Sequence, residues 1–105
     1  MFGWFKREKK EDSNKVHKVF YCIMSKHSDK LLDAEGGEAN SNAIIWKEND
    51  GENQQWTIKE VGGGWHRIKN KSTKQYLTVA GHNEGAKLCI RNGVQGDKNQ
   101  LFKLY

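Results

Sequence analysis

The sequence has no proline and only two cysteines among its 105 residues. Cys22 and Cys89 lie far apart, and neither belongs to a Cys-x-x-Cys motif, so nothing in their spacing indicates a metal site or a redox-active pair. Each cysteine lies in an apolar segment of the sequence. We therefore expect two free, buried thiols that behave as small hydrophobic side chains.

Long apolar runs and long periodic helical patterns are absent as well. The first residues lack the apolar central run of a secretory signal peptide, which together with free thiols predicts a cytoplasmic protein. Short apolar segments are separated by clusters of Asn, Gly, Asp and Ser, such as Asn49-Asp50-Gly51 and Gly62-Gly63-Gly64. Glycine and asparagine adopt a positive φ at low cost, so these clusters mark turns. The pattern predicts one small all-β domain.

Two stretches of the chain end alike: Asn53-Gln54-Gln55-Trp56 and Asn99-Gln100-Leu101-Phe102. The match extends backwards at an offset of 45 residues, with one extra residue before Gln100. It pairs Ile23 with Ile68, Lys26 with Lys71, Ser28 with Thr73, Leu32 with Leu77, Gly36 with Gly81, and Ile45 with Ile90. A repeat of this length usually determines the architecture. We interpret residues 16–61 and 62–105 as two copies of one supersecondary unit.

Each copy contains an apolar strand, a short Leu-containing strand (LLDA or YLTV), a Gly-containing loop, a further apolar strand and a Gln-x-Trp-like ending. This arrangement resembles the ricin B-chain type lectin repeat, the unit of the R-type β-trefoil. The resemblance extends over residues 16–105. It implies an all-β, β-trefoil-like fold and a non-enzymatic domain that binds carbohydrate.

Four short strands are expected in each copy, near residues 17–24, 30–34, 43–48 and 54–60 and near residues 64–70, 75–79, 86–92 and 100–104. The family's trefoil has three such units, and this chain holds two. Two units leave strand edges open and the core partly uncovered, which promotes association. We therefore expect a homo-oligomer that completes the trefoil. Net charges of −3 for residues 16–61 and +6 for residues 62–105 favour contact between unlike repeats of neighbouring chains.

The resemblance places a sugar site in the first repeat. In the family, an Asp after the second strand accepts hydrogen bonds from sugar hydroxyls, an aromatic side chain stacks on the ring, and an Asn before the Gln adds a polar contact. The matching residues here are Asp33, Trp46, Asn53 and Gln54, with Gly36 on the loop that forms the rim. A pyranose needs such a flat apolar platform with directional acceptors. Gln54 has a structural alternative, in which it bonds the backbone within the repeat.

The second repeat has lost two of these features. Thr78 stands at the position of Asp33 and Arg91 at that of Trp46, whereas Asn99 and Gln100 remain. One interpretation is a purely structural repeat that completes the fold. The other is a second, altered site at Arg91, Asn99 and Gln100 that meets a sulfate, phosphate or carboxylate, with basic side chains nearby, namely Arg67, Lys69, Lys71 and Lys87.

Residues 1–15 precede the repeats as a charged and aromatic tail. The simplest interpretation is a solvated terminus. Phe2, Trp4 and Phe5, followed by Lys and Arg, also suit weak contact with a membrane surface or packing onto a partner subunit.

Other functions have little support in the sequence. The four histidines, His17, His27, His66 and His82, show no metal-ligand spacing, so we expect no metal, no cofactor and no catalytic residue. The basic residues accompany neither a recognition helix nor an aromatic RNA-binding motif, so we expect no nucleic-acid partner. The sequence favours binding of a galactose-type or xylan-like glycan. The alternative is a trefoil-like scaffold that binds a protein or a membrane and no sugar.

Overall fold

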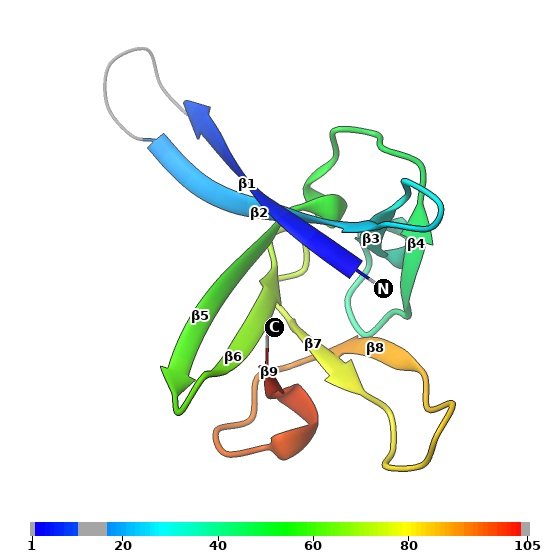
Figure 1. Cartoon of the computed structure of the whole chain (residues 1–105), viewed down its shortest axis with the longest axis vertical. Coiled ribbons are helices and arrows are strands. Elements are labelled where there is room, and N and C mark those ends of the chain that lie inside the picture. The colour runs from blue at the N-terminus through cyan, green and yellow to red at the C-terminus, as the bar shows by residue number, and fades with distance from the viewer. Residues whose placement is uncertain (1, 11–16, 104–105) are drawn as a thin grey trace.

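Nine strands and three short 3-10 helices make up the part of the chain that the structure, a computed structural model, describes: residues 2–10 and 17–103, with side chains from Phe20 onward (Figure 1). The strands are β1 (Phe2–Lys10), β2 (His17–Ser25), β3 (Leu31–Ala34), β4 (Ala43–Trp46), β5 (Trp56–Gly62), β6 (Trp65–Asn70), β7 (Tyr76–Val79), β8 (Leu88–Arg91) and β9 (Phe102–Lys103). The helices are η1 (Glu35–Gly37), η2 (Glu52–Gln54) and η3 (Lys98–Gln100). Within the described residues, no helix has the length and apolar character needed to cross a membrane.

The same order of strand pairing occurs twice along the chain. β2 to β5 and β6 to β9 lie where four strands per copy were expected. In each copy the first strand pairs with the fourth: Tyr21 lies opposite Trp56, and the equivalent His66 lies opposite Phe102. The second and third strands of each copy form the antiparallel hairpins β3–β4 and β7–β8. The two copies therefore fold alike.

β1 departs from the expectation of an N-terminal tail at residues 1–15. Its backbone pairs with β2 in antiparallel register, with Phe2 opposite Ser25. The residue equivalent to Ser25 in the second repeat is Asn70, which lies opposite Trp56. Phe2 thus has the register position of Trp56, and β1 takes the place of the fourth strand of a further repeat. The side chains of Phe2, Trp4 and Phe5, and any membrane contact they make, lie outside the described residues.

The sheet forms a nearly closed, barrel-like wall in the order β1, β2, β5, β6 and β9 (Figure 1). If each repeat contributes its first and fourth strands, three repeats would give six wall strands, of which the described residues supply five. The open place lies between β9 and β1. The chain therefore lacks one wall strand and one hairpin of a complete trefoil.

The core lies inside this wall and beneath the two hairpins. Its buried members are Ile23, Leu32, Ala34, Trp56, Ile68, Leu77 and Ile90. Trp56 has no exposed surface, and its indole N–H donates to the Leu32 carbonyl oxygen at 3.1 Å. Trp56 therefore belongs to the core, because its apolar ring is enclosed and its one polar atom is hydrogen-bonded.

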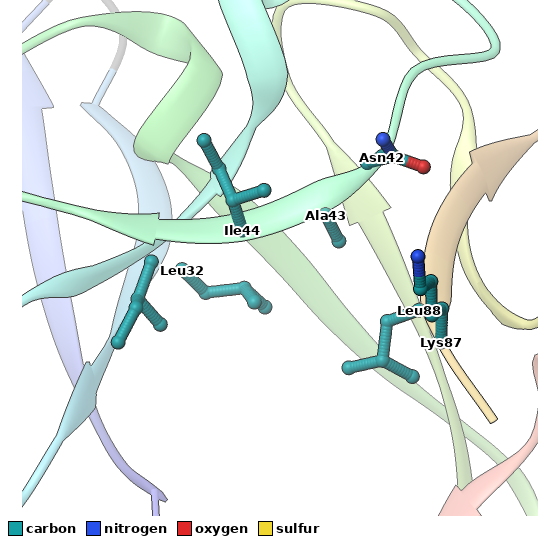
Figure 2. Close-up of a pocket in the computed structure, with 7 residues that line it drawn as sticks. Leu32, Asn42, Ala43, Ile44, Lys87 and Leu88 are labelled. Carbon is teal, nitrogen blue, oxygen red and sulfur yellow. The ribbon is translucent and has the colours of Figure 1, made fainter. Parts of the chain in front are cut away.

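Equivalent residues show where the core remains open. Ile90 is fully buried, and its backbone N–H donates to the Ser41 oxygen in the loop of the first repeat at 2.8 Å. Ile45, the equivalent residue in the first repeat, is 39% exposed, because no further repeat supplies such a loop. A groove of about 350 Å³ lies at this place, lined by Leu32, Asn42, Ala43, Ile44, Ile45, Lys87 and Leu88 (Figure 2). We call it the open groove; it confirms the expected gap in the cover of the core.

Candidate functional site

The β3–β4 hairpin brings Asp33 and Trp46 onto one face. Leu31 lies opposite Trp46 and Asp33 lies opposite Ile44 in the antiparallel register. Directly opposed residues share a face, and side chains alternate along each strand, so Asp33 and Trp46 are diagonal neighbours. Trp46 is 52% exposed, as a stacking platform requires. The two residues that the resemblance assigns to the sugar site therefore lie on one face of the hairpin.

Asp33 is more enclosed than the sequence indicates. It is 2% exposed, and its carboxylate accepts hydrogen bonds from Asn53 Nδ2 at Oδ1 and from Gln54 Nε2 at Oδ2, both at 3.0 Å. Burial raises the pKa of the Asp33 carboxyl, and the hydrogen bonds from Gln54 and Asn53 oppose that shift. The negative charge of Glu35 raises the pKa a little further. The carboxylate therefore combines an internal role with its candidate role in binding.

Gln54 has the structural role that was one of its two alternatives. Its Nε2 also donates to the Lys47 carbonyl oxygen at 2.8 Å, and its Oε1 accepts from the Asn49 backbone N–H at 3.0 Å. The side chain is buried and uses both ends of its amide. Gln54 thus fixes the segment between β4 and η2, and with it the position of Asn53 beside Asp33.

The second repeat contains the same network. Gln100 Nε2 donates to the Asn92 carbonyl oxygen at 2.8 Å and to Thr78 Oγ1 at 3.3 Å, and Gln100 Oε1 accepts from the Val94 N–H at 2.9 Å. Each partner stands 45 residues after its counterpart in the first repeat. The two glutamines therefore perform one structural task, in which Thr78 substitutes for Asp33.

The loop after β3 forms one side of the candidate site. Gly36 lies in η1 with φ at +65°, a conformation that glycine adopts without strain. Gly36 is exposed, and the neighbouring Glu35 is held by Asn42, whose Nδ2 donates to Glu35 Oε1 at 3.4 Å. Gly36 therefore shapes the rim of the site through its backbone.

The predicted altered site of the second repeat is not assembled as an open anion site. Arg91 Nη1 donates to the Asn40 carbonyl oxygen at 2.9 Å and so ties the second repeat to a loop of the first. Gln100 is buried within its hydrogen-bond network, and the Asn99 backbone N–H donates to Asp97 Oδ1 at 2.9 Å. Arg91 and Gln100 therefore serve contacts within the chain.

Two features of the site region were not predicted from the sequence. Gln75 is buried and clamps the loop of the first repeat: its Oε1 accepts from the Asn40 N–H at 2.7 Å and its Nε2 donates to Asn40 Oδ1 at 3.1 Å. Arg67 stacks over the Tyr76 ring, with 3.9 Å between its guanidinium carbon and the ring centre. Neither residue follows a local motif, because both contacts join strands or repeats that are distant in the sequence.

Two further features, a candidate metal centre and the state of the two cysteines, concern the residues whose side chains are described. In that part of the chain no three His, Cys, Asp or Glu side chains gather closely enough to hold a metal ion. Cys22 and Cys89 are buried thiols, as expected from their apolar segments.

Comparisons with known proteins agree with this geometry. The model of the family described as ricin-type beta-trefoil lectin domain-like matches residues 5–91. Among solved structures, the chain is similar to a designed 3-fold symmetric protein, ThreeFoil, with a TM-score of 0.74 and 25% identity over 93% of this chain and 69% of that chain. A search of curated proteins found no match.

A second solved structure is an exo-beta-1,3-galactanase from Clostridium thermocellum, with a TM-score of 0.73 and 22% identity. The match covers 89% of this chain and 23% of the galactanase. At this identity the likeness bears on the fold alone. Together with the three-fold symmetric design, it identifies the fold as a β-trefoil, of which this chain supplies two full repeats and β1.

Proposed function

The chain belongs to the ricin-type β-trefoil lectin domain-like family, and we propose that it binds a glycan through its first repeat without catalysing a reaction. The observation that carries the proposal is the shared face of Asp33 and the exposed Trp46 on the β3–β4 hairpin. Diagonal neighbours of this kind lie roughly 7–8 Å apart, which leaves room for a sugar ring on the indole with its hydroxyls toward the carboxylate.

The difference between the repeats supports a binding role for the Asp33 charge. Thr78 accepts the bond from Gln100 with a neutral hydroxyl, and the second repeat folds in the same way. The structural task therefore needs no carboxylate. A buried negative charge is unfavourable unless it is compensated, so its presence in the first repeat favours a further partner. A carboxylate with two bonds keeps acceptor capacity for sugar hydroxyls.

Galactose-type and xylan-like glycans are the proposed ligand classes. A galactose-type ring suits a single platform and a single clamp, whereas a xylan-like chain would extend past Trp46 along the exposed end of β4. Asn53 stands beside Asp33 and supplies a neutral polar contact to either ligand. The affinity of one such site is low, so association of chains would increase binding through avidity.

Self-association is part of the same proposal. The open groove, with Ile45 at 39% exposure, presents apolar surface that a second copy of the chain would cover. The repeats carry net charges of −3 and +6, which favour contact between unlike repeats. The alternative function, a scaffold that binds a protein without sugar, would use this groove and leave Trp46 in solvent.

A glycan array on the purified protein tests the proposal, with Trp46→Ala and Asp33→Thr proteins beside it. Trp46→Ala removes the platform, and Asp33→Thr introduces the residue type that the second repeat has at the equivalent position, Thr78. We expect the wild-type protein to bind galactose-containing or xylan-type glycans and both variants to lose that binding. Absence of wild-type binding to every glycan would favour the scaffold.

A further inference from the structure

A basic pocket opens where the last strand of the first repeat meets the second repeat, and none of its residues belongs to the first-repeat sugar site. It has a volume of about 350 Å³ and is lined by Thr57, Lys59 and Val61 from β5, Arg67 and Lys69 from β6, and Tyr76 from β7. We call these six residues the basic pocket. Three of the six are cationic, and no acidic side chain lines the pocket.

Strand register forces the three cations together. Lys59 lies directly opposite Arg67, and Lys69 stands two residues further along the same strand, opposite Thr57. Like charges directly opposed in an antiparallel pair are destabilising. Two ion pairs among the described side chains, His66 with Glu60 and Lys71 with Glu52, involve other cations. The pocket thus concentrates positive charge that these ion pairs leave uncompensated.

The first repeat shows that the fold does not require this charge. The residues 45 positions before Arg67, Lys69 and Tyr76 are Cys22, Met24 and Leu31. These side chains pack with Phe20 in an apolar cluster of the first repeat. Apolar residues therefore satisfy the structural need at this place. Arg67 and Lys69 are therefore a departure of the second repeat, and the electrostatic penalty of placing them beside Lys59 needs another explanation.

The Arg67 guanidinium is held in position before any ligand arrives. It stacks on Tyr76, and its Nη2 donates to Gln100 Oε1 at 3.1 Å. The backbone of Gly93 packs closely against Arg67 and Tyr76. A Cβ atom at position 93 would lie 2.6 Å from both Arg67 Nη2 and the Tyr76 ring. A guanidinium has five N–H donors, so most remain available. A side chain fixed in this way loses little entropy on binding.

We propose that the basic pocket binds an anionic saccharide through a sulfate, phosphate or carboxylate group. Arg67 supplies the planar fork that matches such oxyanions, and Lys59 and Lys69 supply point charges on either side. Tyr76 supplies part of the pocket's wall. A volume of about 350 Å³ suits one ring with its anionic group. This second site is separate from the neutral-glycan site proposed for the first repeat.

Titration of the full chain at about 0.15 M ionic strength, where diffuse attraction is screened, tests the proposal. The probes are a sulfated heparin disaccharide, galactose 6-phosphate and glucuronate, with lactose as the neutral control and a short single-stranded oligonucleotide as a competitor class. Backbone NMR shifts locate the binding. We expect saturable binding of at least one anionic sugar, with shifts in β5 and β6, and the preferred probe identifies the anionic group.

Matched variants separate the pocket from overall charge. Lys59→Gln and Lys69→Gln each remove one positive charge from the pocket. Lys98→Gln removes one positive charge from an exposed position in helix η3. We expect the pocket variants to weaken binding by about tenfold, as the loss of a charge-assisted bond implies, and the control by less than about twofold. Replacement of Arg67, Lys69 and Tyr76 by the first repeat's Cys, Met and Leu should abolish binding and keep the fold.

Three results would overturn the proposal. These are no saturable binding of any anionic sugar, an equal loss in Lys98→Gln, or tighter binding of the oligonucleotide than of every sugar. The Asp33→Thr protein keeps the basic pocket and should bind the anionic sugar normally. Failure of the neutral-glycan site is therefore distinguishable from failure of this one.

Discussion

Asp33 and Thr78 hold the same place in the two repeats and accept the same hydrogen bond, from Gln54 Nε2 at 3.0 Å and from Gln100 Nε2 at 3.3 Å. One acceptor is a charged carboxylate and the other a neutral hydroxyl, yet the surrounding strands pair alike. Comparison of these two residues separates the structural role of the position, which is to accept this hydrogen bond, from the effect of the negative charge. The chain thus contains its own control for the candidate site.

Asp33→Thr should remove glycan binding and keep the fold. The hydroxyl can accept from Gln54 as Thr78 does from Gln100, so we expect a stability change within about 1 kcal/mol. Loss of a charge-assisted bond to the sugar should weaken binding by about 1.5–3 kcal/mol, or more than tenfold. Calorimetry with a glycan found on the array, beside thermal unfolding, measures both. Unchanged affinity would remove the Asp33 charge from the site.

Asp33→Ala should behave differently, because it removes the acceptor of Asn53 Nδ2 and one of the two acceptors of the buried Gln54 Nε2. An unsatisfied buried group costs about 1–3 kcal/mol. The alanine variant should therefore lose stability as well as binding. A melting curve equal to that of Asp33→Thr would show that the amide network contributes little.

Glycan affinity should fall on acidification at a pH above the ordinary aspartate pKa of about 3.9. Burial raises the pKa of Asp33, so in the folded protein the carboxyl takes up its proton at a higher pH than in the unfolded chain. Between these two values the folded state binds more protons, and this residue's contribution to stability increases as the pH falls. Binding decreases over the same range, because the protonated group is a weaker acceptor.

The difference between the wild type and Asp33→Asn isolates that titration. Both proteins carry the other acids, including Glu35, so their shared pH response cancels. We expect the affinity ratio to approach one as the pH falls. A ratio that stays constant down to about pH 4 would show that the Asp33 charge does not contribute to binding.

Local sequence patterns sufficed to locate the strands and to assign Trp46 as an exposed aromatic side chain. The Gln-x-Trp-like endings and the Asn-Gly clusters act over a few residues, so the strands of both repeats could be located. Trp46 follows two isoleucines at the end of a strand, and its side chain is 52% exposed. Trp56 ends the first repeat's Gln-x-Trp motif, and its side chain has no exposed surface.

Features that depend on distant pairing were not predictable. β1 has no matching repeat in the sequence, and only its register with β2 shows that Phe2 stands at the position of Trp56. The enclosure of Asp33 depends on the side-chain amides of Asn53 and Gln54, which lie 20 and 21 residues later in the sequence. The basic pocket combines Lys59 and Arg67 through cross-strand pairing, which single-strand patterns do not reveal.

Trp46→Ala should abolish glycan binding with little effect on stability. The side chain is 52% exposed, and exposed substitutions usually change stability by less than about 0.5 kcal/mol. Trp65→Ala is the matched control, since Trp65 is 43% exposed on β6. Tryptophan emission during a glycan titration provides the measurement. A response that persists in Trp46→Ala and disappears in Trp65→Ala would place the platform elsewhere.

Trp56→Ala should destabilise the fold by roughly 3–5 kcal/mol, the range for large aromatic truncation in a core. Trp56→Phe copies the residue at the equivalent position, Phe102, and keeps much of the ring. It leaves the Leu32 carbonyl without the indole donor, so we expect an intermediate loss of about 1–3 kcal/mol. Urea unfolding ranks the three proteins. Equal midpoints for the alanine variant and the wild type would contradict a central role for Trp56.

We expect the chain to self-associate through the open groove, and β1 restricts which oligomer can form. Three chains hold six repeats, enough for two trefoils, but a donated repeat has four strands and β1 already occupies one of those places. A dimer that joins open edges therefore fits better. Ile45→Lys should weaken it, because the substitution puts a charge into the groove. Val94→Lys, at a residue 56% exposed outside the groove, should not.

Sedimentation equilibrium at micromolar concentration measures this association at low and high salt. If unlike repeats meet between chains, higher salt should weaken the dimer, because exposed charges are screened within about 10 Å at 0.1 M. The apolar part of the contact should persist, so Ile45→Lys should dissociate the dimer at both salt concentrations. A well-folded monomer that responds to neither salt nor Ile45→Lys would show that two repeats and β1 suffice alone. In that case the open groove would be available for a different partner.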